Sequence, residues 1–328
     1  MNRLTAIPVD IHWHSDLPIF ACESFLQAVG DEYGWIGGVD DSGHLRCILP
    51  YTVLTKAGFR AVRFRVETIP LEERFDETEE RLFLGKALEF FRATGADMIV
   101  PPSNTALFRT YPEKAAAAPY STFINDLELP EEMLWHGVSE AYRKDIRRAL
   151  RAGVTIEQGM QYLDAAHQLT ADTLSRSGAK LKASKDFLKT IHAFGDNVRV
   201  CAAFHEGVMQ ACLVIPFSAH TAYTLYGGTV PQPVKGSMQL LHWEAIRTFR
   251  ELGVKRFNFT GARTDPEKGS KQEGIMTFKQ RFGGRLVRGY MWKYGFSRIK
   301  FAAYSAVVRM TMGGDVVDLE RHKLASQP

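Results

Sequence analysis

The chain has 328 residues, which corresponds to about two domains of ordinary size. It carries 41 basic and 37 acidic residues, a formal net charge of +4, and its 24% charged and 45% hydrophobic residues are close to the average for globular proteins. This composition excludes a disordered chain, a collagen-like repeat and a small disulfide-rich scaffold. A charge of +4 is too small to indicate a dedicated nucleic-acid-binding protein, although it permits anionic substrates.

Several common motifs are absent from the sequence. The four cysteines are scattered without a C-x-x-C pair, which argues against a zinc site and a disulfide framework and indicates a reducing compartment. The first residues lack the apolar core of a signal peptide, and no apolar run approaches the roughly 20 residues of a membrane-spanning helix. We find no G-x-S-x-G, G-x-G-x-x-G or Walker motif. We therefore expect a cytoplasmic protein without a metal site.

The first half of the chain contains a predicted β-hairpin, followed by a helix and a short strand. Residues 35–54 form two apolar stretches around a polar turn that carries Gly43. Residues 84–100 follow the pattern of an amphipathic helix that ends at Gly95 and leads into a strand.

A basic helix is predicted next, over residues 129–153. Arg143, Arg147 and Arg151 are spaced four apart, so they lie on one face of this helix. They form either a solvated basic face or a surface for phosphate groups, which aligned guanidinium groups suit. The apolar stripe of the helix consists of Val138, Tyr142, Ile146 and Ala149.

The patterns of the first half return in the second half in the same order. Residues 198–217 again form two apolar stretches around a turn with a glycine, and residues 241–259 again form a helix, a glycine and a strand. We infer a tandem duplication of one α/β unit, with a mixed sheet flanked by helices. The predicted boundary divides the chain into residues 1–128 and residues 129–328.

The segment 222–249 contains a candidate ligand loop. A strand is predicted to end at Tyr226-Gly227-Gly228, and Ser237 is a candidate cap for the helix that follows a proline-containing loop. Lys235 and Gly236 are then at a helix N-terminus, where backbone N–H groups favour an anion. The alternative is an ordinary turn between a strand and a helix.

Cations, aromatic rings and glycines are concentrated in the segment 274–284. Lys279 follows Phe278, and Arg281 precedes a further phenylalanine and two glycines. A lysine beside an aromatic wall can stabilise an oxyanion or neutralise a phosphate. The alternative is a surface loop whose basic side chains extend into solvent.

The order of four segments resembles the Fem (FemABX) family of tandem GNAT-fold transferases, which are related to the enzymes of peptidoglycan interpeptide bridges. The resemblance covers essentially the whole chain, because the first half resembles the other GNAT-like unit of the family. It implies an α/β fold with mixed sheets in two tandem GNAT-like (acyl-CoA N-acyltransferase) units. The segments are YRKDIRRALRAGV, YGGT, LLHWEAI and GIMTFKQRFGG, and the most specific piece is F-K-x-x-F-G in the last of them.

The resemblance implies an acyltransferase that moves an aminoacyl or acyl group onto an amine. In Fem enzymes an amino acid passes from aminoacyl-tRNA to an amine on the stem peptide of a cell-wall precursor. The lysine of the F-K motif, here Lys279 after Phe278, is associated with donor binding and with charge at the reacting carbonyl. A strand tyrosine contacts the precursor, and Tyr226 is the candidate match. The expected substrate- and donor-binding residues are Tyr226, Gly227, Gly228, Lys235, Gly236, Arg143, Arg147 and Arg281.

The chain departs from the family pattern at two places. Residues 160–195 are too few for the coiled-coil arm that some Fem enzymes carry, and this arm is proposed to help engage tRNA. The acetyl-CoA loop of single-domain GNAT enzymes is only partly matched, because Gln232 to Gly236 has one residue too many before the glycine. We expect no tightly bound cofactor, and the donor is either aminoacyl-tRNA or acyl-CoA.

Three functions stay open at this point. The first is a Fem-like transferase acting on an anionic cell-wall precursor, and the second is an acyl-CoA-dependent N-acyltransferase acting on an amino sugar in polysaccharide synthesis. The third is a non-catalytic scaffold, against which the composition of 274–284 argues. The basic amphipathic segment 297–312 either contacts the inner face of the membrane or packs as a terminal helix on the second unit. The acceptor, the transferred group and the oligomeric state are not defined by the sequence.

Overall fold

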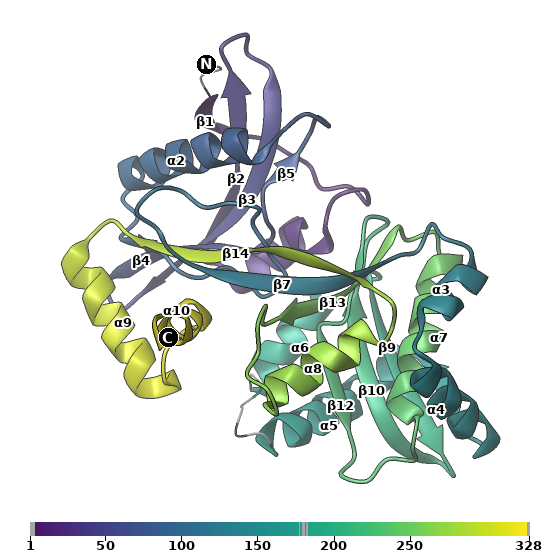
Figure 1. The fold of residues 1–328 in the computed structure, drawn as a ribbon. Helices are drawn as coiled ribbons and strands as arrows, with labels where there is room; N and C mark the ends of the chain where they lie inside the picture. Colours follow the sequence, from purple (N-terminus) through teal and green to yellow (C-terminus); the bar gives the residue numbers. More distant parts are fainter. Residues whose placement is uncertain (1–3, 177, 179–180, 182, 327–328) are drawn as a thin grey trace. The chain divides into compact units, whose positions relative to one another are not determined.

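The computed structural model describes residues 4–176, 178, 181 and 183–326 (Figure 1). The chain forms two compact units. Unit 1 consists of Met1–Trp13, Phe25–Ser121 and Arg288–Pro328, and unit 2 consists of His14–Ser24 and Thr122–Val287. The sequence placed a boundary near residue 128 and assigned all later residues to the second half, whereas the last segment of the chain lies in unit 1.

Unit 1 is built on a sheet with the strand order β1-β2-β3-β4-β6-β14-β7. The predicted hairpin at 35–54 is the antiparallel pair β2–β3, in which Gly37 lies opposite Ile48. The predicted helix begins at Glu77, earlier than expected, because Asp76 caps it and forms a capping box with Glu79. The elements are β1 (Leu4–Val9), β2 (Glu32–Asp40), β3 (Leu45–Lys56), β4 (Phe59–Phe64), β5 (Ile69–Pro70), β6 (Met98–Ile99), β7 (Ala116–Asp126), β14 (Arg285–Gly295), α1 (Glu23–Val29), α2 (Glu77–Ala93), α9 (Arg298–Met312) and α10 (Val316–Ser326); α1, β7 and β14 continue across the boundary of the units.

Both faces of the unit 1 sheet are covered by helices (Figure 1). Helix α2 covers one face, where fully buried Phe64 and Phe83 pack in one cluster with Trp292 of β14. Helices α9 and α10 lie on the other face, where Lys293 Nζ donates to Asp315 at 2.7 Å and Asp318 at 2.6 Å. Trp292 and Lys293 lie on opposite faces of the sheet because successive side chains of a strand point to opposite sides.

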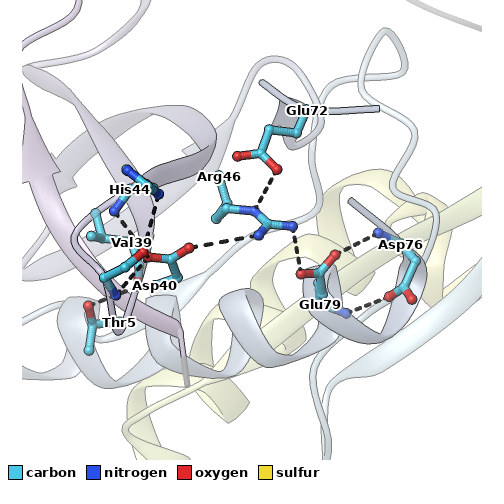
Figure 2. A network of polar contacts seen from close by, with 9 residues as sticks. Thr5, Val39, Asp40, His44, Arg46, Glu72, Asp76 and Glu79 are labelled. Carbon is cyan, nitrogen blue, oxygen red and sulfur yellow. Dashed lines mark hydrogen bonds and ion pairs between the residues drawn. The ribbon is translucent and has the colours of Figure 1, made fainter. Parts of the chain in front are cut away.

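An arginine joins the β2–β3 hairpin to the start of α2 (Figure 2). The guanidinium of Arg46 lies 3.7 Å from the carboxylate of Asp40, 3.2 Å from Glu72 and 3.0 Å from Glu79. Three carboxylates around one half-buried cation neutralise it and fix the loop before α2.

Unit 2 contains a four-stranded antiparallel sheet with the order β12-β10-β9-β8. The predicted hairpin at 198–217 is β9–β10, and the predicted helix and strand at 241–259 are α7 and β13. The elements are a 3₁₀ turn (Ile19–Ala21), α3 (Glu131–Gly137), α4 (Glu140–Arg151), β8 (Thr155–Gln158), a 3₁₀ turn (Met160–Tyr162), α5 (Leu163–Ser175), α6 (Ser184–His192), β9 (Val198–His205), β10 (Val208–Pro216), β11 (Ala222–Tyr223), β12 (Tyr226–Thr229), α7 (Ser237–Glu251), β13 (Arg256–Ala262) and α8 (Lys271–Gln280). Part of the short segment between α5 and α6 lies outside the described residues.

The side chains of β10 alternate between two helical layers. Leu213 packs in the cluster that contains Leu240 and Leu241 of α7, whereas the Cys212 thiol points to α5 and lies 3.5 Å from the carbonyl oxygen of Ala166. Burial on both faces explains the near-continuous apolar sequence of this strand. The chain's cysteines are all buried and form no disulfide; they are Cys22, Cys47, Cys201 and Cys212.

The predicted helix at 129–153 is two helices, α3 and α4, so the single-helix prediction is wrong. Ser139 ends the first segment and caps the second, since its side chain accepts from the backbone N–H of Tyr142. The break also lets Gly137 approach Gly283, where a Cβ on Gly283 would lie 2.6 Å from the Gly137 carbonyl. The predicted apolar stripe is confirmed, because Val138, Tyr142, Ile146 and Ala149 are all buried.

None of the helices among the described residues combines the length and the hydropathy that crossing a membrane requires.

Candidate active site

In unit 2, the chain segment 222–229 changes its partner strand halfway along. Its first part, β11, pairs in parallel with β13, with Tyr223 opposite Asn258. Its second part, β12, pairs with β10, with Tyr226 opposite Val214. The carboxyl-terminal part of β13 therefore loses this neighbour. In open α/β sheets, ligands bind where adjacent strands part at their carboxyl ends.

A buried polar network lies at this end of β13. The amide oxygen of Asn258 accepts from the backbone N–H of Thr260 at 2.7 Å, and the Thr122 hydroxyl lies 2.6 Å from the same oxygen. The Thr122 hydroxyl is also 2.7 Å from the Thr260 carbonyl oxygen. Thr260 has φ of +60°, a left-handed conformation that is strained for a β-branched residue and costs about 1–3 kcal/mol. Such strain is concentrated at functional sites.

Lys279 of α8 reaches this network. Its ammonium donates to the carbonyl oxygens of Thr260 at 3.2 Å and Gly261 at 2.6 Å. Burial lowers the pKa of Lys279 to about 8. Among the described residues no carboxylate lies within ion-pair distance of it. An ammonium has three protons, so one remains for a group placed beside the end of β13.

The neighbours of Lys279 along the helix belong to an aromatic cluster. The ring of Phe278 lies 5.6 Å from that of Tyr142 and 5.1 Å from that of His242. Burial, with a smaller effect of the Lys279 charge, lowers the pKa of His242 to about 4, so this histidine is neutral at pH 7. The guanidinium of Arg281 lies over the Tyr142 ring at 5.5 Å. Phe278 and Arg281 thus hold α8 against α4 and α7. The segment 274–280 is helical, and the loop alternative is wrong for it.

The residues of β12 have mainly packing contacts. The Tyr226 ring lies 5.0 Å from that of Phe187, and burial raises the pKa of its hydroxyl. A Cβ on Gly228 would lie 2.6 Å from the carbonyl oxygen of Leu169, so this glycine lets α5 approach the strand. Gly227 lies opposite Leu213 in the ladder. The YGGT segment is itself the edge strand β12 of this sheet and not the end of a preceding strand.

The loop before α7 is occupied by contacts within the protein. Gly236, not Ser237, is the N-cap of α7, with φ of +95°, and a Cβ there would lie 2.0 Å from the carbonyl oxygen of Asp145. The Lys235 ammonium pairs with the Asp145 carboxylate at 3.4 Å, and the backbone N–H of Val234 donates to Gln210 at 3.1 Å. The Asp145 carboxylate beside this helix N-terminus repels an anion, and the Val234 N–H is already bonded, so the loop is a poor fit for the diphosphate of CoA.

Two of the four arginines of α4, Arg143 and Arg147, contact α3. The Arg143 guanidinium donates to the carbonyl oxygens of Trp135 and His136 at 3.3 Å each and so caps the end of α3. The Arg147 guanidinium lies 5.8 Å from the Trp135 ring. Arg147 also lines an open pocket of about 580 Å³ that includes Trp135 and Trp243.

The sequence-predicted residues therefore fall into separate groups. Lys279 is at the end of β13, and Phe278 and Arg281 support its helix. The remaining predicted residues have their contacts at β12, at the start of α7 and at the α3–α4 junction. Sequence reasoning missed Thr122, Asn258 and Thr260; the polar run N-F-T-G after a buried strand is a signal for the last two, whereas nothing in the sequence marks Thr122. In the described part of the chain, no His, Cys, Asp or Glu side chains group as a metal site.

Comparisons with known proteins concern the fold and the domain type. Residues 138–271 match the acetyltransferase (GNAT) domain family. No curated protein matches the chain in sequence. Among solved structures, FemX is similar over 88% of this chain and 95% of its own, with 13% identity and a TM-score of 0.68. The C-terminal domain of a putative lysylphosphatidylglycerol synthetase from Agrobacterium fabrum is similar over 87% and 91%, with 16% identity and a TM-score of 0.53. L-PGS from Bacillus licheniformis is similar over 87% of this chain and 90% of its own, with 16% identity and a TM-score of 0.50. Structural similarity at such low sequence identity shows that these proteins share a fold with this chain.

Proposed function

We propose that this chain, an acyltransferase with a GNAT domain on a Fem-like fold, transfers an aminoacyl or acyl group onto an amine of a cell-wall precursor or a related glycan. The observation that carries the proposal is the placement of Lys279. The ammonium of half-buried Lys279, which has no carboxylate partner among the described residues, lies at the point where the chain leaves β13 between β11 and β12.

The proposed reaction forms a bond between the acceptor nitrogen and the donor carbonyl carbon. The carbonyl electron pair moves to oxygen as the tetrahedral intermediate forms, and Lys279 donates its remaining N–H to this oxyanion. Collapse breaks the bond to the leaving oxygen or sulfur, which takes up the proton released by the amine. Fixed donors in a site of low dielectric stabilise such charge strongly, because they do not have to reorganise.

For the donor we favour an aminoacyl ester over acyl-CoA. The contacts of Asp145 and Gln210 with the loop before α7 support this choice, since they engage the Lys235 ammonium and the Val234 N–H and place a carboxylate where a CoA diphosphate would lie. The match to the GNAT domain family keeps acyl-CoA as the second candidate. Lys235 and Arg147 reach solvent, and we retain them as candidate contacts for phosphates of the donor or acceptor.

We extend the proposal to peripheral membrane contact through α9. Ile299, Val307 and Met310 form an apolar outer stripe and are 85%, 52% and 78% exposed. Arg298 and Arg309 are exposed beside it, and the helix contains no acidic residue. A basic and apolar helix face suits an anionic lipid surface.

Replacing Lys279 tests the reaction. Transfer of a labelled amino acid from aminoacyl-tRNA, or of acetyl from acetyl-CoA, is measured with a muramyl pentapeptide acceptor and with an amino-sugar acceptor. We expect Lys279→Ala to lower kcat about a hundredfold. The matched control is Lys271→Ala, at the exposed first residue of the same helix, which should leave kcat unchanged. Equal activity of wild type and Lys279→Ala, with both folded by circular dichroism, contradicts the assignment.

Calorimetric titration with CoA and with aminoacyl-tRNA separates the two donors. We expect no heat of binding with CoA and binding of aminoacyl-tRNA that weakens steeply with salt. Micromolar CoA binding reverses the preference.

A further inference from the structure

Two arginines of unit 1 project from the same face of one strand and its extension. Val62, Phe64 and Val66 alternate with them and are buried in the hydrophobic interior. Arg63 and Arg65 therefore project from the opposite face, two residues apart. The Arg65 side chain is deeply buried, with 7% of the residue exposed.

The partners of these guanidinium groups are neutral. Arg65 Nε donates to the Thr52 hydroxyl at 3.1 Å, and its Nη2 donates to the Val29 carbonyl at 2.8 Å. Arg63 Nε is inaccessible to solvent and has no hydrogen-bond acceptor. Among the residues described, no carboxylate lies within 4 Å of either group.

Among the described residues of unit 1, the other arginines that are not exposed are paired with carboxylates. Arg46 lies among three carboxylates (Figure 2), and Arg109 Nε donates to Glu80 at 2.9 Å. Arg60, on the same strand as Arg63, makes two short bonds with Glu32. The absence of an acid is therefore a property of the Arg63 and Arg65 positions and not of the unit.

Two neighbouring cations, with Arg65 buried and Arg63 half-buried, are unfavourable on their own. Removing a guanidinium from water costs several kcal/mol even after relaxation, and the two charges repel each other. Burial lowers the pKa of both groups, that of Arg65 to about 9. The Tyr304 hydroxyl of α9 is close enough to interact with the Arg63 charge, while Asp315 and Asp318, which act on Tyr304, are bonded to Lys293.

We infer that Arg63 and Arg65 form a binding site for a phosphate or diphosphate group, whose negative charge takes the place of the carboxylate partner that neither guanidinium has among the described residues. Two adjacent guanidinium groups match a doubly charged oxyanion better than a carboxylate, because each can donate two parallel N–H bonds to phosphate oxygens. A bound dianion offsets both desolvation and repulsion. The inference does not rest on the proposed transfer reaction.

Calorimetric titration of the full chain with inorganic pyrophosphate tests the site without turnover. Buffers are matched in ionic strength with sodium chloride. The test variant is Arg63→Met combined with Arg65→Met, and the matched control is Arg60→Met on the same strand. We expect wild type and Arg60→Met to bind pyrophosphate with the same Kd, and the double variant to bind at least tenfold more weakly.

Thermal melting without ligand keeps a folding defect separate. We expect the double variant to melt at the wild-type temperature or above it, because methionine removes an unpaired buried charge and keeps the volume. If the double variant does not fold, Arg63→Gln alone replaces it in the titration, with the same tenfold expectation.

Two further probes, a nucleoside diphosphate and a short isoprenyl diphosphate, distinguish the possible sources of the diphosphate group. Tighter binding of one of them, lost in the double variant, identifies the source, and equal binding identifies the diphosphate itself as the recognised group. The inference is overturned if wild type binds none of the three up to 10 mM, or if Arg60→Met loses as much affinity as the double variant.

Discussion

At the scale of single residues, Lys279 is defined by what surrounds it. Two backbone carbonyl oxygens hold its ammonium, and burial lowers its pKa to about 8. A surface lysine keeps its proton well above that pH. The charge on which the proposed oxyanion contact depends is therefore lost within the range of an ordinary activity assay.

The pH dependence of transfer follows from this pKa. Lys279 is protonated below about pH 8 and neutral above it, so kcat should fall as pH rises through 8 and decline about tenfold per unit beyond it. A pH–rate profile from 6 to 10 measures this. In Lys279→Arg the charge persists, and the falling limb should disappear from this range if the guanidinium can be accommodated. A wild-type rate that rises steadily to pH 10 contradicts the donor role.

Gly236 gives a second prediction at this scale. Gly236→Ala should lower the free energy of unfolding by about 2 kcal/mol or more, because a Cβ would meet the Asp145 carbonyl in a left-handed conformation. Gly253→Ala, at the other end of α7, has a similar φ of +75° but nothing within 4 Å, and should cost about 1 kcal/mol. Urea unfolding compares them, and equal losses would mean that the approach of α4 is not limiting.

The candidate site is only partly readable in the sequence. Lys279 is marked by the aromatic, basic and glycine residues around it. Thr122 is not marked, since it joins Asn258 across 136 residues of chain. Nor does a threonine in a strand indicate the positive φ of Thr260, which arises from the network that holds it.

At the scale of elements, features that depend on local sequence patterns could be predicted, whereas features that depend on long-range contacts could not. The two hairpins, the helices after them and the apolar stripe of α4 were predicted, because each depends on periodicity and nearby turn residues. The break between α3 and α4 was not predicted, because it depends on Gly283 approaching Gly137. The N-cap of α7 was placed one residue late for a similar reason, the contact of Gly236 with α4.

Helix α9 carries the prediction for this scale. Its inner side chains include Val308, which is buried, while Ile299 and Met310 are exposed. We expect the protein to float with vesicles that contain anionic lipid, and Ile299→Asp with Met310→Asp to reduce the floated fraction at least fivefold. Val208→Asp, which changes a similarly exposed apolar residue at the β9–β10 turn, is the control. Flotation that is unaffected by the α9 changes rules out this helix as the contact.

At the scale of the whole molecule, the two units do not follow the order of the sequence, because each is built from separate segments of the chain. The duplication inferred from the sequence placed each unit in one half of the chain. The structure instead adds Arg288–Pro328 to unit 1 and His14–Ser24 to unit 2. Strand partners this far apart cannot be found from periodicity, because an apolar strand pattern does not specify which sheet it joins.

Truncation tests the importance of the last segment for unit 1. A fragment of residues 1–128 lacks β14, α9 and α10, and so lacks fully buried Trp292. We expect it to show no cooperative thermal transition by circular dichroism. In the full chain, Trp292→Ala should cost about 3–5 kcal/mol of unfolding free energy. A cooperative melt of the fragment would show that unit 1 is complete without its C-terminal strand.

The position of β14 also has a consequence for biosynthesis. Unit 1 begins to emerge from the ribosome first, but its sheet lacks a strand until Arg288 and later residues have been made. Synthesis of the intervening segment Thr122–Val287 takes roughly 10–30 s at about 5–20 residues per second. During that interval the side of the nascent sheet where β14 will pair is open, and unit 2 is the part of the chain that can be completed. The N-terminal unit is thus the last to close, and the strand edges that stay unpaired longest lie at the beginning of the nascent chain rather than at its end.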